Sequence, residues 1–242
     1  MPDGREPVSV KIVGSIFDID AGEWDACAGS GDPFVSHAFL GALEASGSAA
    51  PESGWLAQHL AIEDEAGRLL ACAPLYLKDH SYGEYVFDWG WADAYQRAGG
   101  SYYPKLQSAV PFVPATGKRL LLRPDAPASL ANALASGMVQ LAERLGVSSV
   151  HVTFPTEAEW QGLGKAGYLL RLGRQFHWEN RGYKTFDDFL ATLTSRKRKA
   201  IRKERRTVAE SGVVVEVLNG ETIEERHWDA FYRFYRDTSD RK

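Results

Sequence analysis

The sequence has few of the residues that mark secreted, membrane-spanning or metal-binding proteins. Its 242 residues include two cysteines, Cys27 and Cys72, which are too few for a disulfide framework and do not form a Cys-x-x-Cys motif. No apolar run approaches the roughly 20 residues that a membrane helix needs. Residues 1–6 lack the basic and apolar regions of a signal peptide. The six histidines show no ligand spacing. We therefore predict a cytoplasmic protein with no transmembrane segment and no metal.

The motifs of phosphate-binding and nucleophilic enzymes are missing as well. The sequence has no G-x-x-x-x-G-K-[ST] and no G-x-S-x-G, and nothing marks a catalytic triad. A G-x-G-x-x-G match does occur at Gly162, Gly164 and Gly167. It follows an expected helix and precedes an expected strand, the reverse of a dinucleotide site. We interpret it as a helix stop followed by a turn.

The composition is that of a globular chain with an uneven charge distribution. Hydrophobic residues make up 44% and aromatic residues 12%, with seven tryptophans, and the net charge is −4. Between Arg196 and Arg206 eight basic residues and one acidic residue give +7, so the rest of the chain carries −11. Positive charge is therefore concentrated in one short segment of an otherwise acidic chain.

The hydrophobic periodicity predicts alternating strands and helices. We expect strands over 8–17, 56–64, 69–78, 85–89, 147–154 and 168–178, an extended stretch over 105–112, and helices over 24–28, 36–46, 127–145 and 155–161. A helical region over 185–210, a strand over 213–218 and a helix over 222–237 follow. This is a mixed α/β (α+β) order, and it resembles the GNAT acyltransferase fold rather than a doubly wound sheet.

An internal repeat links the two ends of the chain. A shift of 204 residues places the sequence Trp24-Asp25-Ala26 on Trp228-Asp229-Ala230. In both places an expected strand precedes the Trp-Asp-Ala helix by the same distance, which favours a duplication over a chance match. We therefore expect a second copy of the domain to have just begun where the sequence ends.

Residues 85–103 have the most unusual composition in the chain, because aromatic rings, carboxylates and glycines alternate there. Such a mixture suits a cleft that grips a sugar or a peptide. The alternative is a loop whose rings fill a core and whose acids are turn residues. The candidates taken from this segment are Trp89, Trp91, Asp93, Tyr95, Tyr102 and Tyr103.

The basic segment lies on an expected helix whose apolar residues recur at three- and four-residue spacing, so its charges fan outward. More positive charge is concentrated there than solubility requires, and phosphates of an RNA or of a pyrophosphate-linked lipid would fit it. The alternative is a solvated helix face. The predicted phosphate-binding residues are Arg196, Lys197, Arg198, Arg202 and Arg206.

Several long strings of the sequence are similar to one family. The strings DPFVSHAFLGALEASG, PLYLKDHSYGEYVFDWGWADAY, YYPKLQSAVPFVPATGKRL, QFHWENRGY, FDDFLATLTSRKRKAIRKERR and WDAFYRFYRDTSDRK resemble the FemAB-like proteins of proteobacteria, labelled peptidoglycan biosynthesis/recognition. The resemblance runs from about residue 32 to the last residue. It implies a cytoplasmic bacterial protein with tandem GNAT-like domains. Better-studied relatives move an amino acid from aminoacyl-tRNA onto the peptide stem of a cell-wall precursor.

The sequence departs from the resemblance in two respects. Family members are longer than 242 residues, so we expect a fragment that lacks nearly all of the second domain. The acyl-CoA pyrophosphate loop of GNAT enzymes, [QR]-x-x-G-x-[GA], is also missing, because residues 122–127 read LRPDAP. Proline supplies no N–H donor to a pyrophosphate. We therefore predict no acetyl-CoA cofactor in the first domain.

The resemblance and the residues together lead to one preferred function and one rival. We expect an N-acyltransferase of FemAB type that moves an acyl or aminoacyl group to an amine of a peptidoglycan precursor. The rival is a non-catalytic module that recognises such a precursor or RNA. Asp93 and Tyr95 are the candidate catalytic residues. The candidate substrate-binding residues are Trp89, Trp91, Tyr102, Tyr103, Lys105, His177 and Trp178.

The expected organisation has three parts. Residues 1–180 form a first GNAT-like domain with a mixed sheet flanked by helices, residues 181–211 a basic linking helix, and residues 212–242 the first strand and helix of a truncated second domain. The aromatic helix of the third part would lack a sheet to cover it. We therefore expect it to promote self-association.

Overall fold

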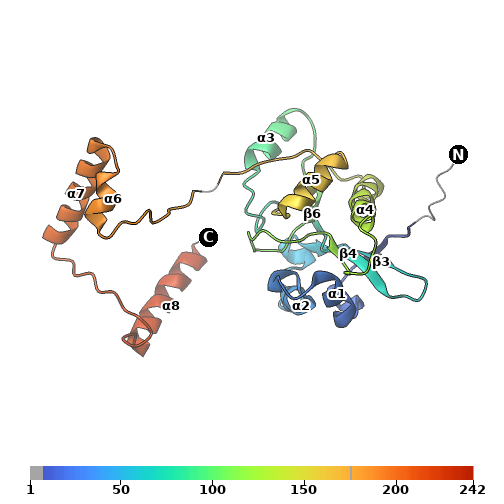
Figure 1. Cartoon of the computed structure of the whole chain (residues 1–242), viewed down its shortest axis with the longest axis horizontal. Helices are drawn as coiled ribbons and strands as arrows, with labels where there is room; N and C mark the ends of the chain where they lie inside the picture. Colours follow the sequence, from blue (N-terminus) through green and yellow to red (C-terminus); the bar gives the residue numbers. More distant parts are fainter. Residues whose placement is uncertain (1–7, 175, 242) are drawn as a thin grey trace. The chain divides into compact units, whose positions relative to one another are not determined.

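The computed structural model describes residues 8–174 and 176–241, and the chain divides into two units at Arg174 (Figure 1). The first unit contains all the described strands and five of the α-helices. The second unit contains three helices. The mixed α/β class predicted from the sequence is confirmed, whereas the three-part division at residues 180 and 211 stays a prediction.

The first unit is built around two four-stranded sheets that share one hairpin. The orders are β1-β3-β4-β7 and β2-β5-β6-β8. One arm of the hairpin runs from β2 directly into β3, and the other from β4 into β5, so each arm serves both sheets. All neighbours pair antiparallel except β6 and β8, which are parallel. The strands are β1 (Lys11–Val13), β2 (Leu56–Ala57), β3 (His59–Glu63), β4 (Leu69–Ala73), β5 (Tyr76–Lys78), β6 (Lys105–Ser108), β7 (Leu121–Leu122) and β8 (Val150–Val152).

Strands β6 and β7 both pair with the β4–β5 arm of the shared hairpin, β6 with β5 and β7 with β4. Gln107 pairs with Tyr76 of β5, and Leu121 pairs with Cys72 of β4. Together they act as one strand that is interrupted by a loop over residues 109–120. The strand β8 lies beside β6 only, so the two sheets diverge beyond this loop.

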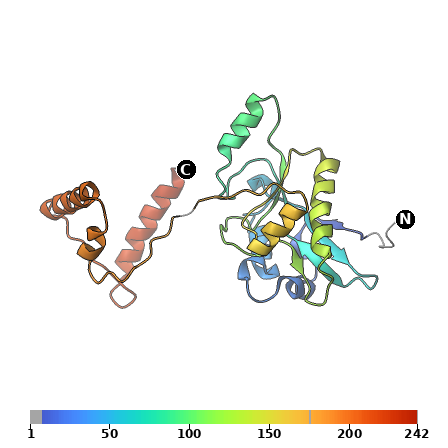
Figure 2. The same ribbon diagram turned by 45° about the horizontal axis from the view of Figure 1, so that its top comes forward.

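Five helices flank the sheets: α1 (Ala21–Ala28), α2 (His37–Ala45), α3 (Trp89–Arg97), α4 (Leu130–Leu145) and α5 (Glu157–Lys165). Their ends follow from local capping. Ser36 caps α2, Thr156 and Glu159 form a capping box on α5, and Gly146 ends α4 in the left-handed conformation that glycine adopts without strain. Helices α4 and α5 lie together on one side of the sheets, and α1 and α2 lie on the other (Figures 1 and 2).

The hydrophobic core forms two main clusters, one on each side of the sheets. Leu134, Met138 and Leu141 of α4 pack with Leu60 and Leu106 from the strands. The stripe that the helical periodicity predicted for α4 is therefore the buried one. On the other side Trp24 of α1 packs with Leu40 of α2 and with residues of β4 and β7. Both faces of the shared hairpin are thus covered.

Two predicted elements of the first unit differ from the structure. Residues 85–89 do not form a strand, because Tyr85 and Phe87 adopt positive φ angles of 58° and 52°, which strand pairing excludes. Residues 168–178 also lack a strand where they are described, and Leu169 and Leu172 are exposed there rather than packed against a sheet. Residue 175 lies outside the described residues.

In the G-x-G-x-x-G motif over residues 162–167, only the last glycine forms a turn. Helix α5 continues through Gly162 and Gly164 and ends at Lys165, later than predicted, and Gly167 then turns the chain with φ of 93°. A Cβ on Gly164 would come within 2.8 Å of the Leu170 side chain, so the glycine allows this close contact. The motif is a packing and turn feature.

The second unit contains α6 (Phe186–Ala191), α7 (Ser195–Glu210) and α8 (Glu225–Asp240). The basic linking helix predicted from the sequence is α7, and the predicted aromatic helix is α8. The predicted strand over 213–218 pairs with no strand in the described part of the chain, and Val214 and Val217 are exposed. A lone strand has no partner for its backbone groups, which explains the difference.

Candidate functional site

Strands β5, β6 and β8 form a sheet with one apolar face and one polar face. Leu77, Leu106 and Val150 face the α4 cluster. The residues between them alternate to the opposite face, as strand geometry requires. Register places Lys78 opposite Lys105, and Gln107 opposite both Tyr76 and His151. Two lysines and a histidine therefore gather on one small face.

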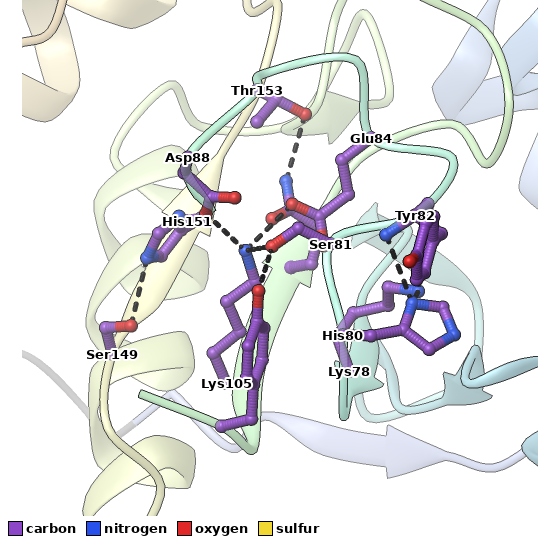
Figure 3. Close-up of polar contacts among 12 residues, drawn as sticks. Lys78, His80, Ser81, Tyr82, Glu84, Asp88, Lys105, Ser149, His151 and Thr153 are labelled. Atoms are coloured by element: carbon purple, nitrogen blue, oxygen red, sulfur yellow. Dashed lines mark hydrogen bonds and ion pairs between the residues drawn. The ribbon is translucent and has the colours of Figure 1, made fainter. Parts of the chain in front are cut away.

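Lys105 is the centre of a buried polar cluster, which we define as Ser81, Glu84, Asp88, Tyr102 and Lys105. Figure 3 shows Ser81, Glu84 and Asp88 around the side chain of Lys105. Its ammonium group donates to Ser81 Oγ at 2.9 Å, to Glu84 Oε2 at 2.8 Å and to Asp88 Oδ2 at 2.8 Å. The Tyr102 hydroxyl donates to the same Asp88 oxygen at 2.7 Å. One cation is thus held between two carboxylates, which leaves a buried charge of −1 when both are ionised.

The two carboxylates are driven to different pKa values. Burial alone would raise the pKa of Asp88, but hydrogen bonds from Lys105, Ser81 and Tyr102 lower it to about 2. Burial raises the pKa of Glu84, and the charge of Lys105 only partly offsets that effect. Paired groups whose environments separate their pKa values are typical of acid–base sites. Asp88 stays ionised, while Glu84 can take up and release a proton.

Several buried oxygens around the cluster have no hydrogen-bond partner among the described residues. They are Glu84 Oε1, Asp88 Oδ1 and Gln107 Oε1. Buried acceptors without donors cost free energy, and native structures contain few of them. The free oxygens of both carboxylates call for a ligand or water that carries N–H or O–H donors.

His151 borders the cluster in its neutral form. Burial, reinforced by the positive charge of Lys105, lowers its pKa to about 4. Its Nε2 lies 2.9 Å from Ser149 Oγ, and its ring meets Tyr102 edge to face at 5.9 Å. At neutral pH the imidazole therefore offers a hydrogen bond without adding charge.

Residues 79–103 cover the polar face and carry four of the five cluster residues. The left-handed conformations of Tyr85 and Phe87 are rare for aromatic residues and occur where surrounding structure enforces them, often at functional sites. The outer side of this segment is aromatic. Its exposed rings are Tyr82, Tyr85, Phe87, Trp89, Trp91 and Tyr95.

The structure brings together three of the substrate-binding residues predicted from the sequence. Tyr102 and Lys105 belong to the buried cluster, and the Tyr103 hydroxyl lies 2.7 Å from Ser81 Oγ. The candidate catalytic residues lie on α3 instead. Asp93 is exposed and pairs with Arg97 at 2.9 Å, and the ring of Tyr95 meets Tyr102 at 6.1 Å.

The remaining predicted residues are more scattered. Trp89 and Trp91 are exposed on α3, where Trp91 lies beneath the Arg171 guanidinium at 5.1 Å. His177 and Trp178 belong to the second unit, and Trp178 contacts the ring of Phe189 of α6 at 6.2 Å. They do not lie on the strand that we predicted for them.

The predicted phosphate-binding residues all lie on α7. Arg196, Lys197 and Arg206 are exposed. Arg202 pairs with Asp187 at 2.8 Å, and Arg198 donates to the Ala191 carbonyl at 3.3 Å, so these two also hold α7 against α6. An outward cationic surface remains on the helix.

Sequence reasoning missed Ser81, Glu84, Asp88 and His151 as site residues. A signal was present in the alternation of polar and apolar residues over 76–78, 105–108 and 149–153. Such alternation predicts a strand with one polar face. The acids that meet this face come from a loop, whose path the alternation does not specify.

The residues at the start of α4 do not fit an acyl-CoA pyrophosphate. Pro127 has no N–H, and the N–H groups of Leu130, Ala131 and Asn132 already donate to carbonyls of the preceding turn. The N–H groups of Arg119 and Leu120 are both bonded to Glu159. Among the described residues no group of three or more histidine, cysteine or acidic side chains is placed to hold a metal ion.

Comparisons with known proteins identify a family and a distantly similar solved structure. A family model described as FemAB-like, peptidoglycan biosynthesis/recognition, matches residues 15–242. No curated protein matches the sequence. The crystal structure of a Trypanosoma brucei acetyltransferase aligns with 13% identity over 72% of this chain and 99% of that one, with a TM-score of 0.42. In the described part of the chain, no helix is both long and apolar enough to span a membrane.

Proposed function

Because the chain belongs to the FemAB-like family, we propose that it transfers an acyl or aminoacyl group to an amine of a peptidoglycan precursor, in the cytoplasm, at the buried polar cluster. The observation that carries the proposal is the pair Glu84 and Asp88. Both are buried, both are held by Lys105, and each keeps one oxygen without a partner among the described residues.

The chemistry needs a neutral amine and a place for its proton. The amine nitrogen attacks the carbonyl carbon of an ester or thioester, a C–N bond forms, and the C–O or C–S bond breaks. Glu84 Oε1 accepts the proton that the nitrogen loses, and this proton then neutralises the leaving alkoxide or thiolate. Burial raises the pKa of Glu84, which is the direction that makes a carboxylate a better proton acceptor.

Asp88 and Lys105 position Glu84 and the incoming amine. Asp88 stays ionised and accepts hydrogen bonds from Lys105 and Tyr102, which fixes the ammonium group of Lys105 beside Glu84. The free Asp88 oxygen is available to an N–H of the incoming amine. Orientation of this kind lowers the barrier without a covalent enzyme intermediate.

Glu84, Asp88 and Lys105 are buried, and the first two belong to the covering segment itself, so substrate reaches the cluster only if residues 79–103 shift. Gly83 and Gly99 adopt positive φ angles of 78° and 85°, so the covering segment bends at residues that tolerate unusual backbone conformations. Aromatic rings on its outer side suit contact with a sugar or peptide.

For the acyl donor we propose aminoacyl-tRNA rather than acyl-CoA. The start of α4 leaves few N–H groups for a pyrophosphate. The cationic surface of α7 fits the phosphates of an RNA. The donor then brings the ester that the cluster needs, and no bound cofactor takes part.

A transfer assay with matched variants tests the proposal. The purified chain is mixed with a labelled aminoacyl-tRNA pool and a stem peptide that contains a diamino acid, and the peptide is analysed by mass spectrometry. We expect Glu84→Gln to lower the transfer rate at least 100-fold. Asp93→Asn, which removes an exposed carboxylate on α3, should retain the rate.

Other outcomes separate the rival functions. Transfer that is lost in Asp93→Asn but kept in Glu84→Gln would place the chemistry on α3, as the sequence analysis predicted. Binding of the stem peptide with no transfer would contradict an enzyme and support a recognition module.

A further inference from the structure

Lys78 is a buried cation with no acidic partner within ion-pair distance among the described residues. It lies directly opposite Lys105 on the neighbouring strand, on the same polar face. Its ammonium group has only two long contacts, to Tyr82 O and to His80 Nδ1, both at 3.4 Å (Figure 3). The ring of Trp55 lies below it, with the centroid 3.7 Å from Nζ. Lys105, by contrast, donates three short hydrogen bonds.

Other donors beside Lys78 also lack partners. Trp55 Nε1 and the Tyr76 hydroxyl are buried and unpaired within the described residues. The rings of Trp55 and Tyr76 are in contact at 5.3 Å, and Tyr76 shares the sheet face of Lys78. The long contacts of Lys78 and the unpaired N–H of the neighbouring Trp55 call for an acceptor, preferably an anion.

The environment of Lys78 does not favour its charge. Burial, together with the like charge of Lys105, lowers its pKa to about 8, although Glu84 and Asp79 oppose this. Asp79 is largely exposed, and Glu84 is already bonded to Lys105. His80, the other titratable group beside Lys78, has a pKa that is itself lowered by burial.

We propose that Lys78 binds the carboxylate of the acceptor, so that the acceptor is the zwitterionic end of an amino acid. This inference rests on the proposed function. Glu84 and Asp88 offer free oxygens to an amine, and Lys78 offers its ammonium group on the adjacent strand. Register pairs Lys78 with Lys105, which holds both carboxylates, so Lys78 lies on the strand next to the groups that would bind the amine. An amino acid presents its amine and its carboxylate side by side, whereas a plain alkylamine leaves Lys78 without an anionic partner.

Two small probes test the inference without a transfer assay. Lysine has a zwitterionic end and a plain amine end, and cadaverine has two plain amine ends. We expect the full chain to bind lysine at least 10-fold more tightly than cadaverine in a calorimetric or NMR titration. Bound lysine should also raise the pKa of Lys78 above about 8, as followed by NMR of its side chain.

Matched variants assign the preference to one residue. Lys78→Met removes the charge and keeps the shape, and its fold is checked by circular dichroism. We expect it to bring the two affinities within about 2-fold of each other. Lys165→Met, which changes an exposed lysine of α5, should keep the preference.

Every outcome bears on the inference. Equal affinities in the unmodified chain, no binding of either probe, or a preference that survives Lys78→Met would each overturn it. A preference for lysine in a chain that never transfers an acyl group would sustain the site and contradict only the proposed function.

Discussion

Helices α1 and α8 carry the same Trp-Asp-Ala sequence and have opposite environments. Trp24 of α1 is fully buried, and its indole N–H donates to the Val35 carbonyl at 2.8 Å. Trp228 of α8 is 52% exposed, and the aromatic rings that follow it on the helix are exposed as well. The difference lies outside the repeated sequence, because α1 packs on β4 and β7, whereas α8 has no sheet among the described residues of the second unit.

The comparison shows that burial depends on the partner and not on the helix alone. Aromatic residues at helical spacing predict an apolar face in both helices. In the first unit a sheet removes this face from water. In the second unit α6 and α7 are joined by polar contacts at their surfaces.

The largest expected effect tests the two tryptophans directly. Trp24→Ala should destabilise the first unit by about 4 kcal/mol, because it empties a large buried site and removes a buried hydrogen bond. Trp228→Ala should change the free energy of unfolding by about 0.5 kcal/mol or less. Urea unfolding followed by hydrogen exchange of amides in each unit measures both. Equal losses for the two variants would show that α8 is as well packed as α1.

The second prediction compares a buried and an exposed ion pair. Lys105→Met should cost about 3 kcal/mol, since it leaves two buried carboxylates without their cation. Arg202→Met breaks the exposed pair with Asp187 and should cost about 0.5 kcal/mol or less. Thermal unfolding at pH 7 measures the difference. A small cost for Lys105→Met at pH 7 would mean that Glu84 takes up a proton in compensation.

The third prediction concerns pH and the first unit. The folded pKa of His151 is lowered to about 4 from 6.5, so the folded state binds fewer protons than the unfolded state between these values. Stability should therefore be full above pH 6.5 and fall as the pH decreases towards 4. Asp88, with its folded pKa of about 2 against 3.8, adds a further loss at lower pH. His151→Asn should flatten the upper part of this profile in chemical unfolding at constant ionic strength, and an unchanged profile would contradict the assignment.

The smallest effect on stability belongs to the cationic surface of α7. Changing Arg196, Lys197 and Arg206 to Gln should leave unfolding unchanged within about 0.5 kcal/mol, because these residues are exposed. The affinity for tRNA should fall, and its dependence on salt should become less steep. The same three substitutions with no change of affinity across a salt series would leave α7 as a solvated face.

The sequence predicted much of the fold because several elements depend on local signals. Ser36 and Gly146 mark the ends of α2 and α4, and the apolar stripe of α4 follows helical spacing. The errors occur where distant contacts decide. Residues 85–89 have the composition of a strand, yet Tyr85 and Phe87 adopt positive φ angles in the loop that carries Glu84 and Asp88 to Lys105. Residues 213–218 have the composition of a strand but no partner in the described structure.

The site was only partly predictable from the sequence, because residues that are far apart along the chain come together in it. The unusual composition of residues 85–103 drew attention to Tyr102 and Tyr103, which the structure places beside Lys105, two residues further along the chain. Glu84 and Asp88 meet Lys105 only because the covering segment folds back over β6. His151 joins them through the parallel pairing of β6 and β8, which no local pattern specifies.

The alternation of polar and apolar residues on β5 and β6 also protects the pairing of the strands themselves. If β5 slipped by one residue against β6, Tyr76 and Lys78 would face the apolar side chains of α4, and Leu77 would face Asp88 and Glu84. Because β5 continues the arm that also carries β4, such a slip would displace both sheets. Lys78 thus helps to fix the register, since a slipped β5 would have to bury its ammonium group among apolar side chains.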